Sequence, residues 1–258
     1  MVLLKDLELE LFESVSLKDL DKVALLNRID NKYVFNASLL GNILKDLVND
    51  YYILEIDGRR NFAYFTTYYD TVSLEMFINH VRGKLNRFKV RHRIYVDSGL
   101  SFLEIKFKNN KNRTIKWRTK EAFEDQENSK LNNEFLKKHV PYSAEELTPS
   151  LQNKFNRITL VDKDFTQRVT FDFKLGFNGN GDIEKEVHEI AIAELKIDKD
   201  NKNNKLLEVL RKYKIPLSGF SKYCIGKTIS DDSLCHKKSN LKPKILGLNK
   251  IANKTITK

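Results

Sequence analysis

The stretch NRFKVRHRIYVDSGLSFLEIKFKNNKNRTIKWRT, residues 86–119, decides the fold. It contains three runs in which basic and apolar residues alternate, at 86–97, 101–108 and 113–119. Successive side chains of a β-strand point to opposite faces, so each run predicts a strand with one charged and one apolar face. The links between the runs are short and rich in Asp, Asn, Ser and Gly, which is typical of hairpin loops. We therefore expect an antiparallel meander, which must close into a barrel or have its edges covered.

The charged faces of the predicted strands are dominated by basic residues. Similar alternation recurs in the strands expected around residues 28–32, 157, 168–172 and 194–198, and the faces together carry thirteen basic residues against five acidic ones. Like charges that oppose one another destabilise a sheet. A single strand of this kind would be explained by a solvated sheet face, but recurrence over at least seven strands favours a lumen that binds a polyanion. The apolar faces would then point outward and require cover from helices.

The composition is that of a soluble, folded chain. Its 258 residues are 41% hydrophobic and 31% charged, and the net charge is +11. No apolar run approaches the roughly 18 residues of a membrane span, and glutamates interrupt the leucines near the N-terminus, so we expect no secretory signal there. Two cysteines favour a reducing, cytoplasmic location. Residues 236–258 hold seven lysines and no acidic residue, which predicts a mobile basic tail.

Further strands and several helices are expected around the meander. Periodicity and capping residues predict helices over 3–26, 36–48, 73–81, 128–139 and 203–213, and strands over 27–35, 51–56, 62–69, 153–160, 167–173 and 187–198. The predicted fold class is α+β: an antiparallel β-barrel tunnel of about eight strands, with a basic polar lumen and helices packed on the outside. We expect an N-terminal helical segment over 1–25, the tunnel domain over 26–230, and a flexible tail over 231–258.

Acidic residues on the charged faces have two possible roles. Glu104 and Glu194 could each neutralise a neighbouring lysine, or hold a divalent metal that bridges phosphate oxygens. The five histidines are dispersed and the chain has no His/Cys cluster of the kind that binds zinc. His92 lies on an apolar strand face and is expected to pack there. The sequence has no glycine-rich phosphate loop, so a bound nucleotide would be held by side chains.

Eight short motifs, in order and with compatible spacing, carry a family resemblance. They are RIDNKY at 28–33, YYDT at 68–71, KVRHRIY at 89–95, FLEIK at 102–106, RTIK at 113–116, QRVTFD at 167–172, ELK at 194–196 and FSKY at 220–223. Together they resemble the vacuolar transporter chaperone (VTC) domain, a polyphosphate polymerase domain of the triphosphate tunnel metalloenzyme, or CYTH-like, superfamily. The resemblance covers residues 26–227.

The resemblance implies an enzyme, an ATP-polyphosphate phosphotransferase that uses Mn²⁺ or Mg²⁺ and takes ATP and polyphosphate as partners. It implies roles for twelve residues. The catalytic phosphate-binding residues of the tunnel would be Lys32, Arg91, Arg93, Lys106, Arg157 and Arg168. Further substrate contacts would come from Lys108, Lys116, Lys196, Ser221 and Lys222, and Glu194 would bind the metal.

The sequence departs from the superfamily at one informative point. Hydrolases and cyclases of the superfamily begin with a Glu-x-Glu-x-Lys strand, whereas this chain reads Arg28-x-Asp30-x-Lys32, which favours a polymerase lumen. Two alternatives are a tunnel triphosphatase that hydrolyses inorganic or organic triphosphates, and a polyphosphate-binding domain without turnover. Nucleic acid is not expected to bind, because the aromatic residues mostly lie on the faces opposite the cations. The acceptor, the product length and the oligomeric state stay open.

Overall fold

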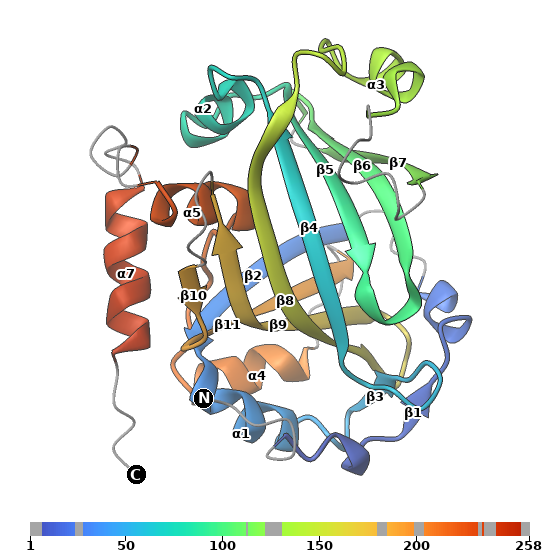
Figure 1. Ribbon diagram of the computed structural model, residues 1–258. Coiled ribbons are helices and arrows are strands. Elements are labelled where there is room, and N and C mark those ends of the chain that lie inside the picture. Colours follow the sequence, from blue (N-terminus) through green and yellow to red (C-terminus); the bar gives the residue numbers. More distant parts are fainter. Residues whose placement is uncertain are drawn as a thin grey trace.

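The computed structural model describes residues 7–23, 28–111, 113–121, 131–179, 185–198, 204–231, 234 and 241–253. Its centre is an 11-stranded sheet (Figure 1). Eight strands form the main path, each antiparallel to its neighbours. In spatial order they are β2 (Arg28–Asn36), β11 (Ile190–Asp198), β9 (Gln167–Asn178), β8 (Thr148–Asp162), β4 (Phe62–Asp70), β5 (Arg87–Tyr95), β6 (Leu100–Lys108) and β7 (Thr114–Glu121). Three short strands lie off this path: β1 (Ser14–Val15), β3 (Tyr51–Leu54) and β10 (Lys185–Val187).

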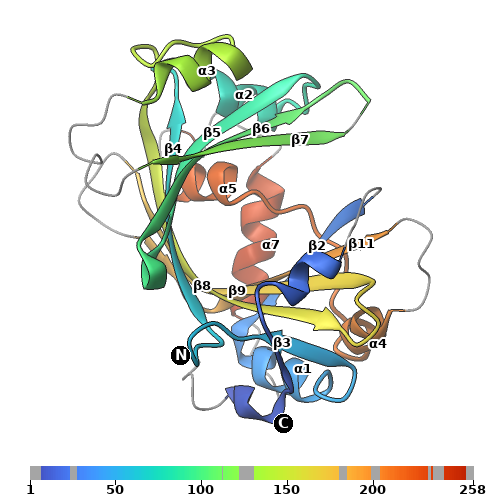
Figure 2. The same ribbon diagram turned by 90° about the vertical axis from the view of Figure 1, so that its right-hand side faces the viewer.

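The sheet curves strongly but is not closed by hydrogen bonds. Figure 2 shows its strong curvature, with β5, β6 and β7 on one side of the bend and β9, β11 and β2 on the other. Within the described residues β2 and β7 are the two ends of the path and do not pair with each other. Part of the edge of β2 is instead taken by the chain after α4, where Leu217 bridges to Tyr33 and the Ser218 amide donates to the Lys32 carbonyl at 2.7 Å. The antiparallel α+β architecture is confirmed, and the barrel is an open one.

Helices cover the outward, apolar side of the sheet, as the alternating strand faces require. The largest core cluster packs α1 (Leu40–Lys45) and α4 (Lys205–Lys212) against β2, β11, β9 and β8. A second cluster joins α2 (Glu75–Val81) and α3 (Asn133–His139) to the outer face of β5 and β6 through Met76, Leu136, Val90 and Leu103. No helix among the described residues is long and apolar enough to cross a membrane.

Two helices that the sequence analysis did not predict pack against the sheet in one core cluster (Figure 1). They are α5 (Lys222–Ile229) and α7 (Lys242–Ala252). The Ser221 hydroxyl caps α5 by accepting a hydrogen bond from the Cys224 amide at 3.3 Å. Gly226 lets α5 lie directly on β8 and β9, because a Cβ atom there would come within 2.3 Å of the Phe177 ring. This close approach places Ser221 and Lys222 at the concave side of the sheet.

Both ends of the chain differ from expectation. The helix predicted for 3–26 is wrong: its described part forms the 3-10 turns Leu9–Leu11 and Asp19–Lys22, with β1 between them. Strand β1 pairs with β3, so its backbone hydrogen bonds leave the segment instead of forming a helix. The expectation of a free tail is wrong for α7, which packs on β2 and β11 through Leu248 and Ile251. The Asn36 side chain fixes this helix by donating to the carbonyls of Ile251 and Ala252, each at 3.1 Å.

The remaining predicted elements are found with shifted bounds. The helix predicted for 36–48 is a 3-10 turn at Ala37–Leu39 followed by α1, and the turn at Val96–Ser98 makes the link between β5 and β6. Strand β8 is longer than predicted at both ends, because its Thr148–Leu151 portion pairs with the end of β4. Residues 128–130, where the fourth helix was expected to begin, lie outside the described residues.

Candidate functional site

A cavity of about 1040 Å³ lies on the concave side of the sheet. Thirteen basic and two acidic side chains line it, so the basic faces of separate strands do converge on one hollow. All twelve residues proposed from the sequence are among the lining residues: Lys32, Arg91, Arg93, Lys106, Lys108, Lys116, Arg157, Arg168, Glu194, Lys196, Ser221 and Lys222.

Strand register arranges these side chains in rows that run across the sheet. On one wall Lys106 of β6 lies directly opposite Lys89 of β5 and Lys116 of β7. On the other wall Glu194 of β11 lies opposite Lys32 of β2, and Lys196 lies opposite Arg168 of β9 in the next row. Because opposed residues come within contact distance on the same face, each row concentrates charge at one level of the cavity.

One wall contains a buried carboxylate held by an arginine and a lysine. Glu104 is fully buried, and its Oε2 atom accepts from Arg91 Nε at 2.8 Å and from a terminal guanidinium nitrogen at 2.5 Å. Its other oxygen accepts from Lys116 Nζ. Burial alone would raise the pKa of Glu104, but the charges of Arg91, Arg93 and Lys116 hold that pKa well below its usual range. Of the two roles considered for Glu104, these contacts favour neutralisation of cations.

The opposite wall repeats this arrangement with residues from three other elements. Asp172 of β9 is buried and pairs with Arg157 of β8 through two hydrogen bonds of 2.6 and 2.8 Å. Lys222, the first residue of α5, also donates to Asp172. The charges of Arg157 and Lys222 outweigh burial and hold the pKa of Asp172 far below its usual range. The sequence places Asp172 on a charged strand face, but its contacts were not predicted. Arg157 is its cross-strand partner on β8, and Lys222 reaches it from α5.

Glu194 is the carboxylate best placed to act inside the cavity. Its Oε1 atom lies 3.3 Å from Lys32 Nζ, and the charges of Lys196, Lys32, Arg157 and Lys106 overcome burial to keep its pKa well below the ordinary value. Glu194 is therefore ionised and presents hard oxygen ligands. Among the described residues no three His, Cys, Asp or Glu side chains come together, so a divalent ion here would take most ligands from a bound phosphate.

Several lysines of the cavity have lowered pKa values, so their protonated form is disfavoured. The charge of Arg91, and then burial, lower the pKa of Lys106 well below its ordinary value. Burial is the main cause that lowers the pKa of Lys196 and of Lys222 to about 8. An anion in the cavity would remove this crowding, so the site is built to receive negative charge.

Two aromatic rings pack against arginines of the cavity. Tyr64 and Phe155 stack in parallel with centroids 5.1 Å apart, and the guanidinium carbons of Arg93 and Arg157 lie 5.2–5.6 Å from both rings. The Lys222 ammonium lies 4.4 Å from the Phe155 centroid. These cation–π contacts hold the cations in place without neutralising them. The ring pair forms across the β4–β8 register, a signal that needs the strand order and is absent from local sequence.

Other lining cations were visible in the sequence as charged-face residues but were not assigned a role. Arg87, Lys89 and Arg118 line the cavity, and Lys89 Nζ donates to Ser221 Oγ at 3.1 Å. His92 is buried on the opposite face of β5, which confirms its predicted packing role, and burial lowers its pKa.

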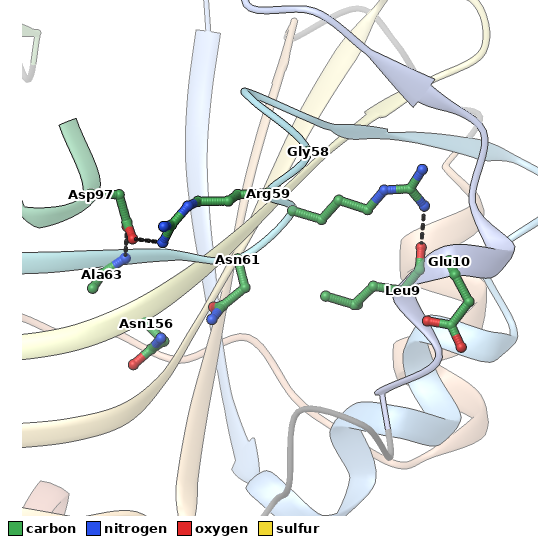
Figure 3. A pocket seen from close by; sticks show the side chains of 9 residues that line it. Leu9, Glu10, Gly58, Arg59, Asn61, Ala63, Asp97 and Asn156 are labelled. Carbon is green, nitrogen blue, oxygen red and sulfur yellow. Dashed lines mark hydrogen bonds and ion pairs between the residues drawn. The ribbon is translucent and has the colours of Figure 1, made fainter.

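A second hollow of about 480 Å³ lies against the N-terminal segment and the start of β4 (Figure 3). Three of its four charged side chains make internal contacts. Arg59 pairs with Asp97 at 2.8 Å, the same carboxylate accepts from the Ala63 amide, and Arg60 donates to the Leu9 carbonyl. This hollow holds the chain together and offers far fewer charges to a ligand than the large cavity.

Comparison with known proteins gives a family match and several distant structural similarities. A family model of the VTC domain matches residues 27–230. A search of curated proteins gave no match. Among solved structures, a proposed adenylate cyclase from Bacillus halodurans has a TM-score of 0.48 and 10% identity over 76% of this chain and 94% of its own. A proposed adenylate cyclase from Vibrio parahaemolyticus has a TM-score of 0.45 and 14% identity over 76% and 95%. A proposed adenylyl cyclase from Hippeastrum, described as having a dominant triphosphatase activity, has a TM-score of 0.44 and 13% identity over 78% and 95%.

Proposed function

Since the chain belongs to the VTC domain family, a family of triphosphate tunnel enzymes, we propose that it is a polyphosphate polymerase. It would transfer the terminal phosphoryl group of ATP onto a polyphosphate chain. The family match supports the resemblance carried by the eight sequence motifs. The proposal goes beyond family membership and assigns one reaction to this chain.

The observation that carries this proposal is the charge of the cavity. Thirteen basic side chains line it, and the two lining acids with the buried pair Glu104 and Asp172 balance only a few of them. One triphosphate brings too few negative charges to balance the rest. A longer chain of phosphates in the same hollow would do so, because each added phosphate brings further charge. The surplus therefore favours a polymer as ligand over a lone triphosphate.

The chain's own residues would bind and align the reacting groups. Lys32, Arg157, Arg168 and Lys222 on one wall and Arg91, Arg93 and Lys106 on the other would contact phosphate oxygens of donor and acceptor. A terminal oxygen of the acceptor forms the new bond to the γ-phosphorus, the bond to the bridging oxygen breaks, and ADP leaves. Fixed cations stabilise the charge on the transferred group and on the leaving oxygen without having to reorganise.

A divalent metal fits this site through Glu194. The family implies such a requirement, and the ionised carboxylate of Glu194 lies among the lining residues with oxygen ligands that suit Mg²⁺ or Mn²⁺. When bound, the ion would neutralise charge on the phosphate oxygens. The surrounding lysines would orient the triphosphate so that its oxygens complete the coordination.

Incubation with ATP and Mn²⁺ or Mg²⁺, followed by electrophoresis of the products on a polyphosphate gel, tests the proposal. Long chains together with stoichiometric ADP are the expected result. Free phosphate without chains would replace the proposal with a triphosphatase. Tight polyphosphate binding with neither product would replace it with a binding domain. For variants of the cavity lysines, Lys120→Met on β7 is the matched control, because Lys120 is exposed and does not line the cavity.

A further inference from the structure

The N-terminal segment 7–23 lies before the residues matched by the VTC family model, yet it forms part of the cavity. It is firmly attached to the sheet. Strand β1 pairs with β3, with Val15 opposite Leu54. A terminal nitrogen of Arg60 donates to the carbonyls of Leu9 and Phe12, at 2.7 and 3.1 Å. The segment is therefore positioned before any ligand binds.

A hydrogen-bonded turn in this segment directs one leucine into the cavity. The Ser16 amide and hydroxyl both donate to the Asp19 carboxylate, at 3.0 and 2.6 Å, and the Asp19 amide donates back to the Ser16 hydroxyl at 3.3 Å. Leu17 lies inside this turn, is 59% exposed and lines the cavity. Single exposed leucines are common on protein surfaces, but this one is held at the edge of a cavity lined mainly by cations.

Leu17 belongs to an apolar end of the cavity that directly follows the cationic rows. Leu20 and Leu54 also line this end, and both pack with Val161 of β8. Val161 lies opposite Arg168 in the strand register, and Arg168 lies opposite Lys196. The row that contains Glu194 lies two residues away along β11, or roughly 7 Å. Apolar surface thus begins where the phosphate-binding row ends.

We propose that this apolar end, centred on Leu17, is a subsite for the base of a nucleoside triphosphate whose phosphates lie among the adjacent cations. The inference rests on the proposed function. A flat heterocycle covers aliphatic surface favourably, and ligand sites commonly combine apolar walls with a few polar groups. The subsite distinguishes a nucleotide from inorganic triphosphate.

The alternative is that these leucines only close the end of the cavity. Leu20 and Leu54 are buried and could do so alone. Leu17 is mostly exposed, so it seals nothing in the absence of a ligand. A base that packs on Leu17 would cover this exposed surface, whereas a simple plug would already have buried it.

The test compares two ligands on three proteins at one fixed ionic strength and metal concentration. Dissociation constants are measured by calorimetry for the β,γ-imido analogue of ATP and for inorganic tripolyphosphate. The proteins are the wild type, Leu17→Ser, and the matched control Leu11→Ser, since Leu11 is 51% exposed on the same segment and does not line the cavity. We expect Leu17→Ser to weaken binding of the ATP analogue about fivefold, which is the effect of losing roughly 40 Å² of apolar contact. Binding of tripolyphosphate should be unchanged. Leu11→Ser should change neither constant.

A gain-of-contact variant gives a second reading. Leu17→Phe should tighten binding of the ATP analogue, because bases stack on aromatic rings. It should leave binding of tripolyphosphate unchanged. Equal effects on both ligands, or no effect of Leu17→Ser on the ATP analogue, would overturn the subsite while tripolyphosphate binding still supported the proposed function. If the wild-type protein bound neither ligand, the proposed function would fall and this inference with it.

Discussion

Replacement of Lys106 by methionine should stabilise the protein and at the same time weaken its hold on polyanions. Lys106 lies in the middle of a cross-strand row between Lys89 and Lys116, and the neighbouring charge of Arg91 is the main cause of its depressed pKa. Methionine keeps the long aliphatic stem and removes the charge. The unliganded protein therefore loses repulsion, whereas the liganded protein loses a phosphate contact.

The magnitude follows from the register. Directly opposed residues have Cβ atoms about 5 Å apart, and two like charges at about 6 Å repel by about 3 kcal/mol at an effective dielectric near 20. Attraction to Glu194 and loss of the Lys106 proton offset part of this repulsion, which leaves a net gain of about 1–3 kcal/mol. For a chain of this size each kcal/mol shifts Tm by about 2–4 °C. Loss of a charge-assisted hydrogen bond should weaken tripolyphosphate binding by about 1.5–3 kcal/mol.

The pH dependence gives this prediction a sign. Because the folded-state pKa of Lys106 is depressed, the unfolded chain binds more protons between that depressed value and the ordinary value of about 10.4. The stability of the wild type therefore rises with pH across this window, and the advantage of Lys106→Met should shrink there. Thermal unfolding at several pH values and calorimetry with tripolyphosphate check both parts, with Lys120→Met as control. A variant that is less stable than the wild type at neutral pH, or that binds equally well, would refute the idea of charge crowding.

Three further predictions concern the metal, the packing of α5 and the lysines with depressed pKa. Glu194→Gln should abolish metal-dependent turnover, whereas metal-free tripolyphosphate binding should persist. It should also weaken Mn²⁺ binding in the presence of an ATP analogue, measured by electron paramagnetic resonance. An unchanged Mn²⁺ signal would exclude a metal role for Glu194. Gly226→Ala should lower stability by about 1–3 kcal/mol through overpacking against β8 and β9, whereas Gly247→Ala in α7, where a Cβ atom meets nothing within 4 Å, should not; equal effects on Tm would contradict this. Tripolyphosphate affinity should fall as pH rises through about 8, because Lys196 and Lys222 lose their protons there, and a flat profile between pH 7 and 9 would disprove it.

The strands, and the face to which each charged residue points, could be predicted because both depend on local alternation. The run from Arg87 to Ile94 has one charged and one apolar face in any antiparallel sheet, and the structure places its basic residues in the cavity. The antiparallel pairing of β5, β6 and β7 followed from two short links. These properties need no knowledge of distant contacts.

What could not be predicted depends on contacts between distant segments. The leucine spacing in residues 3–26 is compatible with a helix, but pairing of β1 with β3 and the contacts of Arg60 decide otherwise. The segment around Gly226 has weak helical propensity, and its helix forms because it packs on Phe177 and is capped by Ser221. In the basic tail, α7 is held in place by Asn36, more than 200 residues earlier, whose side-chain amide donates hydrogen bonds to the carbonyls of Ile251 and Ala252.

The two buried carboxylates explain how a cavity with so many cations can exist before its ligand arrives. Glu104 and Asp172 each hold one arginine and one lysine, on opposite walls, so two negative charges offset half of the charge of four lining cations. Without these two carboxylates, the repulsion between the lining cations would act in full on the folded state. If every cation were neutralised, the cavity would not attract a polyanion. Both carboxylates are fully or almost fully buried, so a bound metal or phosphate does not compete for them. The cations of Lys106, Lys196 and Lys32 remain crowded around Glu194, one of the two carboxylates that line the cavity. If the proposed function holds, phosphate would meet these lysines beside the carboxylate that would hold the metal, and phosphoryl transfer would need both.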